Sequence, residues 1–231
     1  MKLTSMKSTL MSSVTRAGLT FSPRRLSQRF RKDEDGIAAI EFAIIAPIMI
    51  GMYFGLAEIA SAISVDRRIS HGTNVAGDLA TQQAELRDAD IEEVVSAALR
   101  VMGVQNIGQV SMDMESFILP AEGQPPESRG RIRVNSSVGG FSNFDASNLD
   151  TRLLNENSGV VVTRVRYNYT PVEVRFLDST VRLQETFLLK PRRSDAVDFQ
   201  DGNGSLVDCT ATSYSNVSCS VASRYAPAPG L

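Results

Sequence analysis

Residues 36–65, GIAAIEFAIIAPIMIGMYFGLAEIASAISV, decide the fold of this chain. Every residue of the stretch after Gly36 is apolar or small, apart from Glu41 and Glu58. A helix needs only about 20 such residues to cross a hydrocarbon core of roughly 30 Å. The stretch therefore predicts a membrane-spanning helix over residues 37–65.

Such an apolar run has two other interpretations. A core helix of a soluble domain normally carries a polar stripe, whereas no face of residues 44–56 carries a charge. A cleavable secretory signal has an apolar core of about 7–15 residues that ends in a small-residue site. This run is much longer and holds a carboxylate near its start, so we expect no cleavage behind it.

The residues that flank the run predict its orientation. Only two basic residues, Arg67 and Arg68, follow the run closely. The segment before it contains many more: Lys2, Lys7, Arg16, Arg24, Arg25, Arg29, Arg31 and Lys32. An excess of Lys and Arg marks the cytoplasmic side of a membrane helix. We expect residues 1–36 to be a basic cytoplasmic leader and the residues after the helix to lie outside the cytoplasm.

Glu41 is the unusual residue of the run. A carboxylate at the centre of a membrane helix costs about 2.5–3.5 kcal/mol on insertion scales, so such a group is usually paired or functional. The alternative is that Glu41 reaches the interfacial layer and has no further role.

Gly36, followed by Ile37-Ala38-Ala39-Ile40-Glu41-Phe42 and a long apolar run behind a basic leader, resembles the TadE-like pseudopilins of the tight adherence (Flp pilus) machinery. The resemblance implies that a prepilin peptidase cuts between Gly36 and Ile37. Ile37 then becomes the first mature residue, Glu41 the fifth and Phe42 the sixth. The acidic Asp33-Glu34-Asp35 before Gly36 departs from a purely basic leader.

Cleavage after Gly36 creates an α-amino group on Ile37, with a reference pKa near 8, in apolar surroundings. In the family that the chain resembles, the fifth-position Glu is thought to neutralise the amino terminus of a neighbouring subunit, which implies this role for Glu41. Gly51 and Gly55 form a small-xxx-small pair that permits close packing of helices.

The remaining sequence predicts an α+β fold: a long N-terminal transmembrane helix, then a small pilin-like domain with an amphipathic helix packed on an antiparallel sheet. Residues 66–104 are expected to be helical. Their clearest helix has Asp90 as N-cap with Glu93 three residues on, and it ends at Gly103. Glycines at positions 72 and 77 weaken the helical pattern before it.

Residues 105–193 alternate in hydrophobicity and predict the antiparallel β region, with strands near 110–119, 131–135, 160–169, 172–176 and 181–189. Residues 159–193 also resemble, more loosely, the carboxy-terminal part of TadE-like proteins, which a Pro-Arg motif often closes. Residues 194–231 are expected to be a loop-rich tail.

The tail holds both cysteines, Cys209 and Cys219. In an oxidising compartment we expect them to form a disulfide, and the alternative is two free thiols. Residues 201–205 offer oxygen ligands loosely like a calcium loop, but Thr212 stands where the bidentate acid belongs, so a plain turn is the favoured interpretation. His71 lies in no metal-ligand cluster.

The composition and motifs narrow the function. A net charge of −2 gives no reason to expect nucleic-acid binding, and no catalytic constellation, cofactor motif or metal site is recognised. By the resemblance we expect no enzyme but a minor pilin-like subunit of the bacterial inner membrane, with a periplasmic domain. Its partners would be membrane lipid, the prepilin peptidase, other pilin-like subunits and the pilus assembly platform. The alternative is an unprocessed single-pass protein whose outer domain binds a ligand or partner.

Overall fold

The computed structural model describes residues 36–121, 124–149, 157–171, 180–200 and 204–224. The chain divides into two compact units, Met1–Met52 and Tyr53–Leu231, which are treated separately below. Three sequence expectations lie outside the described residues: the leader up to residue 35, the strand over 172–176 and the calcium-like turn at 201–203.

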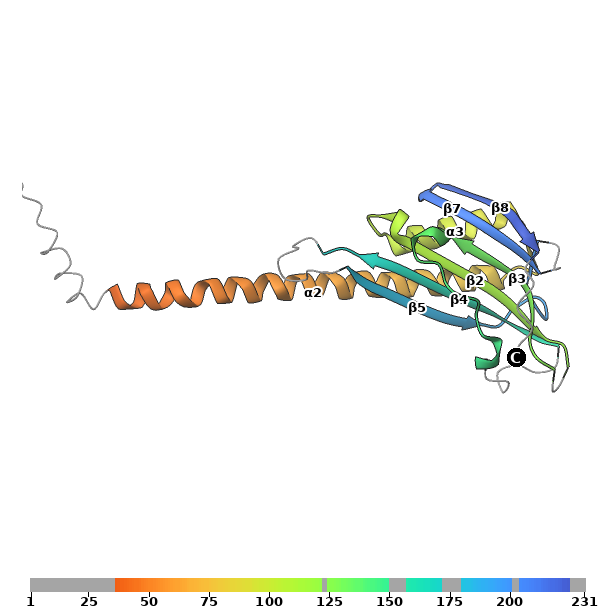
Figure 1. The fold of residues 1–231 in the computed structure, drawn as a ribbon, viewed down its shortest axis with the longest axis horizontal. Helices are drawn as coiled ribbons and strands as arrows, with labels where there is room; N and C mark the ends of the chain where they lie inside the picture. The colour runs from red at the N-terminus through yellow and green to blue at the C-terminus, as the bar shows by residue number, and fades with distance from the viewer. Residues whose placement is uncertain (1–35, 122–123, 150–156, 172–179, 201–203, 225–231) are drawn as a thin grey trace, which may run out of the picture. The chain divides into compact units, whose positions relative to one another are not determined.

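Helix α2, Ile37–Thr81, is one continuous helix (Figure 1). Its residues 37–52 are the described part of the first unit, and its residues 53–81 open the second. Pro47 lies inside the helix without ending it. Buried side chains begin at Glu58 and become frequent only after Val65, so α2 changes from an exposed apolar helix to a packed helix along its length.

A six-stranded sheet forms the centre of the second unit, in the order β5-β4-β2-β3-β7-β8 (Figure 1). The strands are β2 (Val110–Leu119), β3 (Glu127–Val134), β4 (Ser158–Tyr169), β5 (Val181–Leu189), β7 (Ser205–Ser213) and β8 (Asn216–Arg224). Neighbours are antiparallel except β3 and β7, which are parallel. Two short strands, β1 (Glu85–Leu86) and β6 (Asp198–Phe199), pair separately. The α+β fold with a largely antiparallel sheet agrees with the sequence prediction.

Helix α3, Asp88–Met102, lies on this sheet and begins earlier than we expected. Asp90 is not the N-cap. The cap position is Arg87, and Asp90 stands three residues inside, where its carboxylate accepts a hydrogen bond from the Arg87 backbone N–H at 3.2 Å. The helix starts three residues early because Asp90 satisfies a donor from within the first turn rather than from in front of it. Gly103 ends the helix in the left-handed conformation, at φ 54°.

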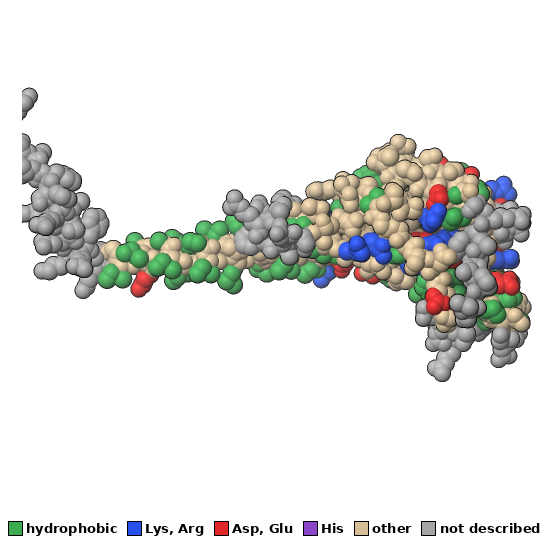
Figure 2. Space-filling model, viewed as in Figure 1, with side chains coloured by type: hydrophobic (Ala, Val, Ile, Leu, Met, Phe, Trp, Pro, Cys, Tyr) green, Lys and Arg blue, Asp and Glu red, His purple; other side chains and the backbone are tan. Residues whose placement is uncertain are grey.

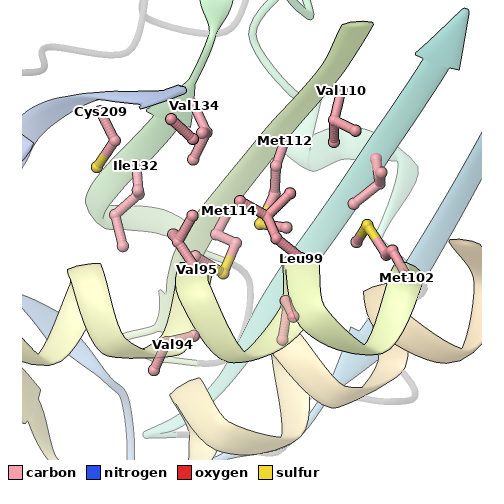
Figure 3. Packing of buried hydrophobic residues seen from close by; sticks show 14 of the residues in the cluster. Val94, Val95, Leu99, Met102, Val110, Met112, Met114, Ile132, Val134 and Cys209 are labelled. Carbon is pink, nitrogen blue, oxygen red and sulfur yellow. The ribbon is translucent and has the colours of Figure 1, made fainter. Parts of the chain in front are cut away.

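The main core lies between the helices and one face of the sheet. Figure 3 shows α3 residues such as Val95 and Leu99 directed toward Met112 and Met114 of β2 and toward Ile132 of β3. The second half of α2 contributes the fully buried residues Ile69, Ala76 and Ala80 to the same cluster.

Gly72 and Gly77 are the reason why α2 can lie so close to its neighbours. A Cβ atom on Gly72 would stand 2.3 Å from Cγ of Met102 in α3, and one on Gly77 would stand 2.4 Å from Cδ1 of Leu189 in β5. These glycines weaken helix propensity, but packing offsets that cost by allowing the close approach.

The opposite face of the sheet is covered by residues 136–149, which include the short helical turns Ser136–Val138 and Ala146–Asn148. Asp113 of β2 is 1% exposed and accepts hydrogen bonds from Arg131 Nε at 2.6 Å and from Arg164 Nε at 3.0 Å. Arg131 also donates to Asn143 Oδ1 at 2.5 Å and to the Phe141 carbonyl at 2.9 Å. This buried cluster joins β2, β3 and β4 to the covering segment.

The C-terminal region differs from our expectation. Residues 198–224 are not loop-rich: they contain β6, β7 and β8. Strand β7 alternates between buried and less buried positions, but its inward residues are Ser205, Val207, Cys209 and Ala211. Because most of these side chains are small, the period of two is weak in the sequence, and the strand becomes evident from its pairing with the distant β3 and with β8.

Candidate membrane-spanning and assembly helix

The first part of α2 presents apolar side chains outward in every direction. Residues 37–63 expose a series of large hydrophobic side chains: Ile37, Ile40, Phe42, Ile44, Ile45, Ile48, Met49, Ile50, Met52, Tyr53, Phe54, Leu56, Ile59 and Ile63. Figure 2 shows hydrophobic side chains gathered along this helix. A long exposed apolar surface is unfavourable in water. By length and composition α2 is able to cross a membrane, and none of its most apolar stretch is buried against the rest of the protein.

The residues expected at the processing site lie at the start of this helix. Gly36 directly precedes α2, and a Cβ atom placed on it would meet no atom within 4 Å. Ile37 is the first helical residue, and 55% of its side chain is exposed. Glu41 and Phe42 follow one turn later and are both exposed. Among the described residues Glu41 makes no hydrogen bond or ion pair.

Gly51 and Gly55 stand one helical turn apart, and therefore on the same side of α2. A Cβ atom at Gly55 would meet nothing within 4 Å, which contrasts with the crowded Gly72 and Gly77 further along the helix. The two pairs of glycines thus have different surroundings: the later pair is used within the fold, while Gly55 faces open space.

Residues 36–78 match the family model described as TadE-like protein. The chain carries a TadE-like segment. The match begins at Gly36 and ends three residues before the end of α2, so it covers both the exposed and the packed part of the helix. No curated protein and no solved structure matches the chain.

The TadE-like segment contains Gly36, Ile37, Glu41, Phe42 and the pair Gly51 and Gly55, while the sheet lies outside it. Gly72 and Gly77 also belong to the segment, although sequence reasoning did not recognise their role in packing. The two glycines are five residues apart and pack against different neighbours, Met102 and Leu189. No simple sequence motif therefore predicts their role.

Outside the TadE-like segment, Cys209 and Cys219 are joined by a disulfide with an S–S distance of 2.03 Å. The two residues are directly opposed in the register of β7 and β8, with Cα atoms 4.1 Å apart. The Cys219 backbone N–H donates to Glu92 Oε1 of α3 at 2.9 Å. The disulfide therefore lies where the edge strand β8, its neighbour β7 and helix α3 meet.

Glu58, one of the two carboxylates of the apolar run, is 6% exposed and so belongs to the packed part of the second unit. The Asp113, Arg131 and Arg164 cluster was not recognised in the sequence either. Its members lie far apart in the chain and are joined by strand pairing, so no local spacing could reveal them.

Proposed function

We propose that this chain is a minor pilin-like subunit of the tight adherence (Flp pilus) machinery. In this proposal a prepilin peptidase processes it after Gly36, and it acts in pilus assembly and surface adherence. The observation that carries the proposal is the TadE-like match that starts at Gly36, directly before an exposed apolar helix with a carboxylate at its fifth position.

The proposed assembly step follows from electrostatics. After processing, the Ile37 α-amino group would be largely protonated at neutral pH and would lie in an apolar environment, five residues from the Glu41 carboxylate counted inclusively. Each charge is costly in hydrocarbon unless it is paired. Pairing Glu41 of one subunit with the new amino terminus of a neighbour would offset both costs and set the relative height of the two helices.

The proposed location is the bacterial inner membrane, crossed once, with the leader in the cytoplasm and the sheet domain in the periplasm. The excess of Lys and Arg before Gly36 supports this orientation. A disulfide between Cys209 and Cys219 suits an oxidising compartment outside the cytoplasm. The proposed partners are membrane lipid, the prepilin peptidase, other pilin-like subunits through the side of Gly51 and Gly55, and the assembly platform.

The amino-terminal sequence of the membrane-associated protein tests this proposal, with and without the peptidase. We expect the mature protein to start at Ile37 only when the peptidase is present. A Gly36→Asp variant should remain uncleaved, while the matched Gly55→Ala variant, which changes a glycine on the same helix, should be cleaved normally. Retention of the leader in both strains would overturn the proposal. It would favour instead an unprocessed single-pass protein whose outer domain binds a ligand or partner.

A further inference from the structure

The second unit contains a cavity of about 460 Å³ that the proposed function does not use. One wall is α2, with Ser61, Ser64 and Arg68; the others are the segment after α3, with Val104, and the end of β4, with Tyr167 and Tyr169. Ligand sites in proteins commonly have volumes of about 300–1,000 Å³ and combine apolar walls with a few polar groups. The cavity has the size and lining of a site for a small ligand or part of a larger one.

The place of the cavity along α2 matters because the helix there changes character. Ile59 and Ile63 are the last large apolar side chains of α2 that are exposed, and they are interleaved with the cavity residues Ser61 and Ser64. The first charged side chains after them begin at Asp66. A hydrocarbon core is crossed by about 20 helical residues, and phospholipid headgroups lie just beyond it. In an α2 that spans a membrane, the cavity therefore lies at the depth of the headgroups.

The polar groups of the cavity suit a phosphate. The Arg68 Nη1 atom donates to the Gly103 carbonyl at 3.1 Å, which holds the guanidinium beside the cavity. Among the described residues this is the one hydrogen bond of the Arg68 side chain, and a guanidinium has five N–H donors arranged to bind phosphate in a bidentate manner. The Ser64 hydroxyl is a further group that can hydrogen bond to phosphate or glycerol oxygens, whereas the Ser61 hydroxyl donates to the Ala57 carbonyl at 2.9 Å.

Two features of the surroundings favour an anion at the membrane surface. Among the described residues that line the cavity there is no Asp or Glu, so no described carboxylate opposes a bound phosphate. Tyr167 and Tyr169 are 6% and 7% exposed and belong to the main core, so the wall that they form is held in place by packing. Burial raises the pKa of the Tyr167 phenol.

We propose that this cavity binds the phosphate headgroup of a membrane phospholipid, with Arg68 on the phosphate and the acyl chains along the exposed apolar face of α2. The proposal rests on the membrane-spanning role of α2. It is independent of processing after Gly36 and of any role in a pilus.

Native mass spectrometry of the full chain in detergent tests this proposal with lipids of matched acyl chains. We expect phosphatidylglycerol to be retained about tenfold better than diacylglycerol, which lacks the phosphate, because a charge-assisted hydrogen bond is lost with it. An Arg68→Gln variant should lose this preference. The matched Arg67→Gln variant removes an exposed charge outside the cavity and should keep it.

A second variant guards against misfolding and non-specific charge effects. Ser64→Leu places a larger side chain in the cavity and leaves Arg68 unchanged. This variant should lose the preference for phosphatidylglycerol. Its thermal unfolding transition should be retained, which shows that it is folded. Equal retention of the two lipids, or equal losses in the Arg67 and Arg68 variants, would overturn the proposal.

Inorganic phosphate alone distinguishes a free anion from a lipid as the source of the phosphate. Binding of inorganic phosphate as strong as that of the lipid would overturn the lipid assignment, whereas weaker binding would support it. Flotation of each variant with vesicles checks the membrane anchor separately. A wild-type protein that floats normally but shows no lipid preference counts against the cavity site and leaves the proposed function untouched.

Discussion

Gly77 of α2 lies against Leu189 of β5 so closely that a Cβ atom on the glycine would stand 2.4 Å from Leu189 Cδ1. The same atom would stand 3.0 Å from Thr163 Oγ1 of β4. This contact joins the end of the TadE-like segment to the edge of the sheet, so the helix proposed to cross the membrane is also part of the core of the second unit.

A Gly77→Ala variant should be less stable than the wild type by about 1–3 kcal/mol, because an extra carbon in a well-packed core forces side chains or backbone to move. Denaturant unfolding of the protein in detergent, followed by circular dichroism, measures the loss. Asn74→Ala is the matched control, since Asn74 is exposed on the same helix. A Gly77→Ala variant as stable as this control would show that the contact relaxes without cost.

Asp113→Ala should destabilise the protein by about 3–5 kcal/mol, because it leaves Arg131 and Arg164 buried without their carboxylate. Asp208→Ala removes a carboxylate that pairs with Arg133 on the same sheet, but that pair is about one third exposed. Its loss should cost at most about 1 kcal/mol. Similar values for the two variants in denaturant unfolding would contradict a structural role for the buried cluster.

Replacing both Cys209 and Cys219 with alanine should lower the free energy of unfolding by about 2–3 kcal/mol, since the bridge closes a short loop and restricts the unfolded chain. A thiol reductant should lower the stability of the wild type by a similar amount and leave the double variant unchanged. Insensitivity of the wild type to reductant, with reduction verified by thiol labelling, would be the contrary result.

Glu185→Gln should increase stability at neutral pH. Burial, and secondarily the charge of Asp66, raises the pKa of Glu185 above its reference of 4.5. The folded state therefore holds this proton more tightly than the unfolded chain, and the stability that it contributes is complete below about pH 4.5 and is lost as the pH rises through the folded pKa. Unfolding of both proteins from pH 3 to 8 should give curves that converge at the acidic end. Glu93→Gln, at an exposed site on α3, should not change this pH dependence.

Glu41→Ala should leave membrane insertion intact, because it removes a charge that is costly in hydrocarbon. It should impair assembly, because the amino terminus of a neighbouring subunit loses its partner. Flotation reports insertion, and co-purification of differently tagged copies or pilus partners reports assembly. Ile45→Ala truncates an exposed side chain one turn later and serves as the control. Normal assembly of the Glu41 variant would refute the pairing role.

Several features of this protein can be inferred from local sequence alone, because they depend on the hydrophobicity, length and composition of contiguous segments. The apolar run after Gly36 is long enough to indicate a membrane helix whatever the rest of the chain does. The density of β-branched and aromatic residues from Val160 to Tyr169 likewise predicts strand β4. The candidate site at Gly36, Ile37 and Glu41 is local in the same sense, since its members lie within two helical turns.

The features that escaped prediction depend on partners distant in the chain. Strand β7 has small inward residues such as Ser205 and Ala211, and its place follows from pairing with β3 about 75 residues away. Helix α3 starts before the predicted position because the Asp90 carboxylate caps the helix from within the first turn. The predicted arrangement, with Asp90 as the N-cap, uses the same side chain in a similar way.

The sequence by itself determined the apolar helix, the carboxylate within it and the α+β character of the chain, because hydrophobic period and length are properties of contiguous residues. Only the tertiary structure shows why positions 72 and 77 require glycine, which residues pair with Asp113 and where the cavity beside Arg68 lies. Each of these depends on distances between atoms of separate helices and strands. Such distances arise only when side chains pack at the density of a protein interior.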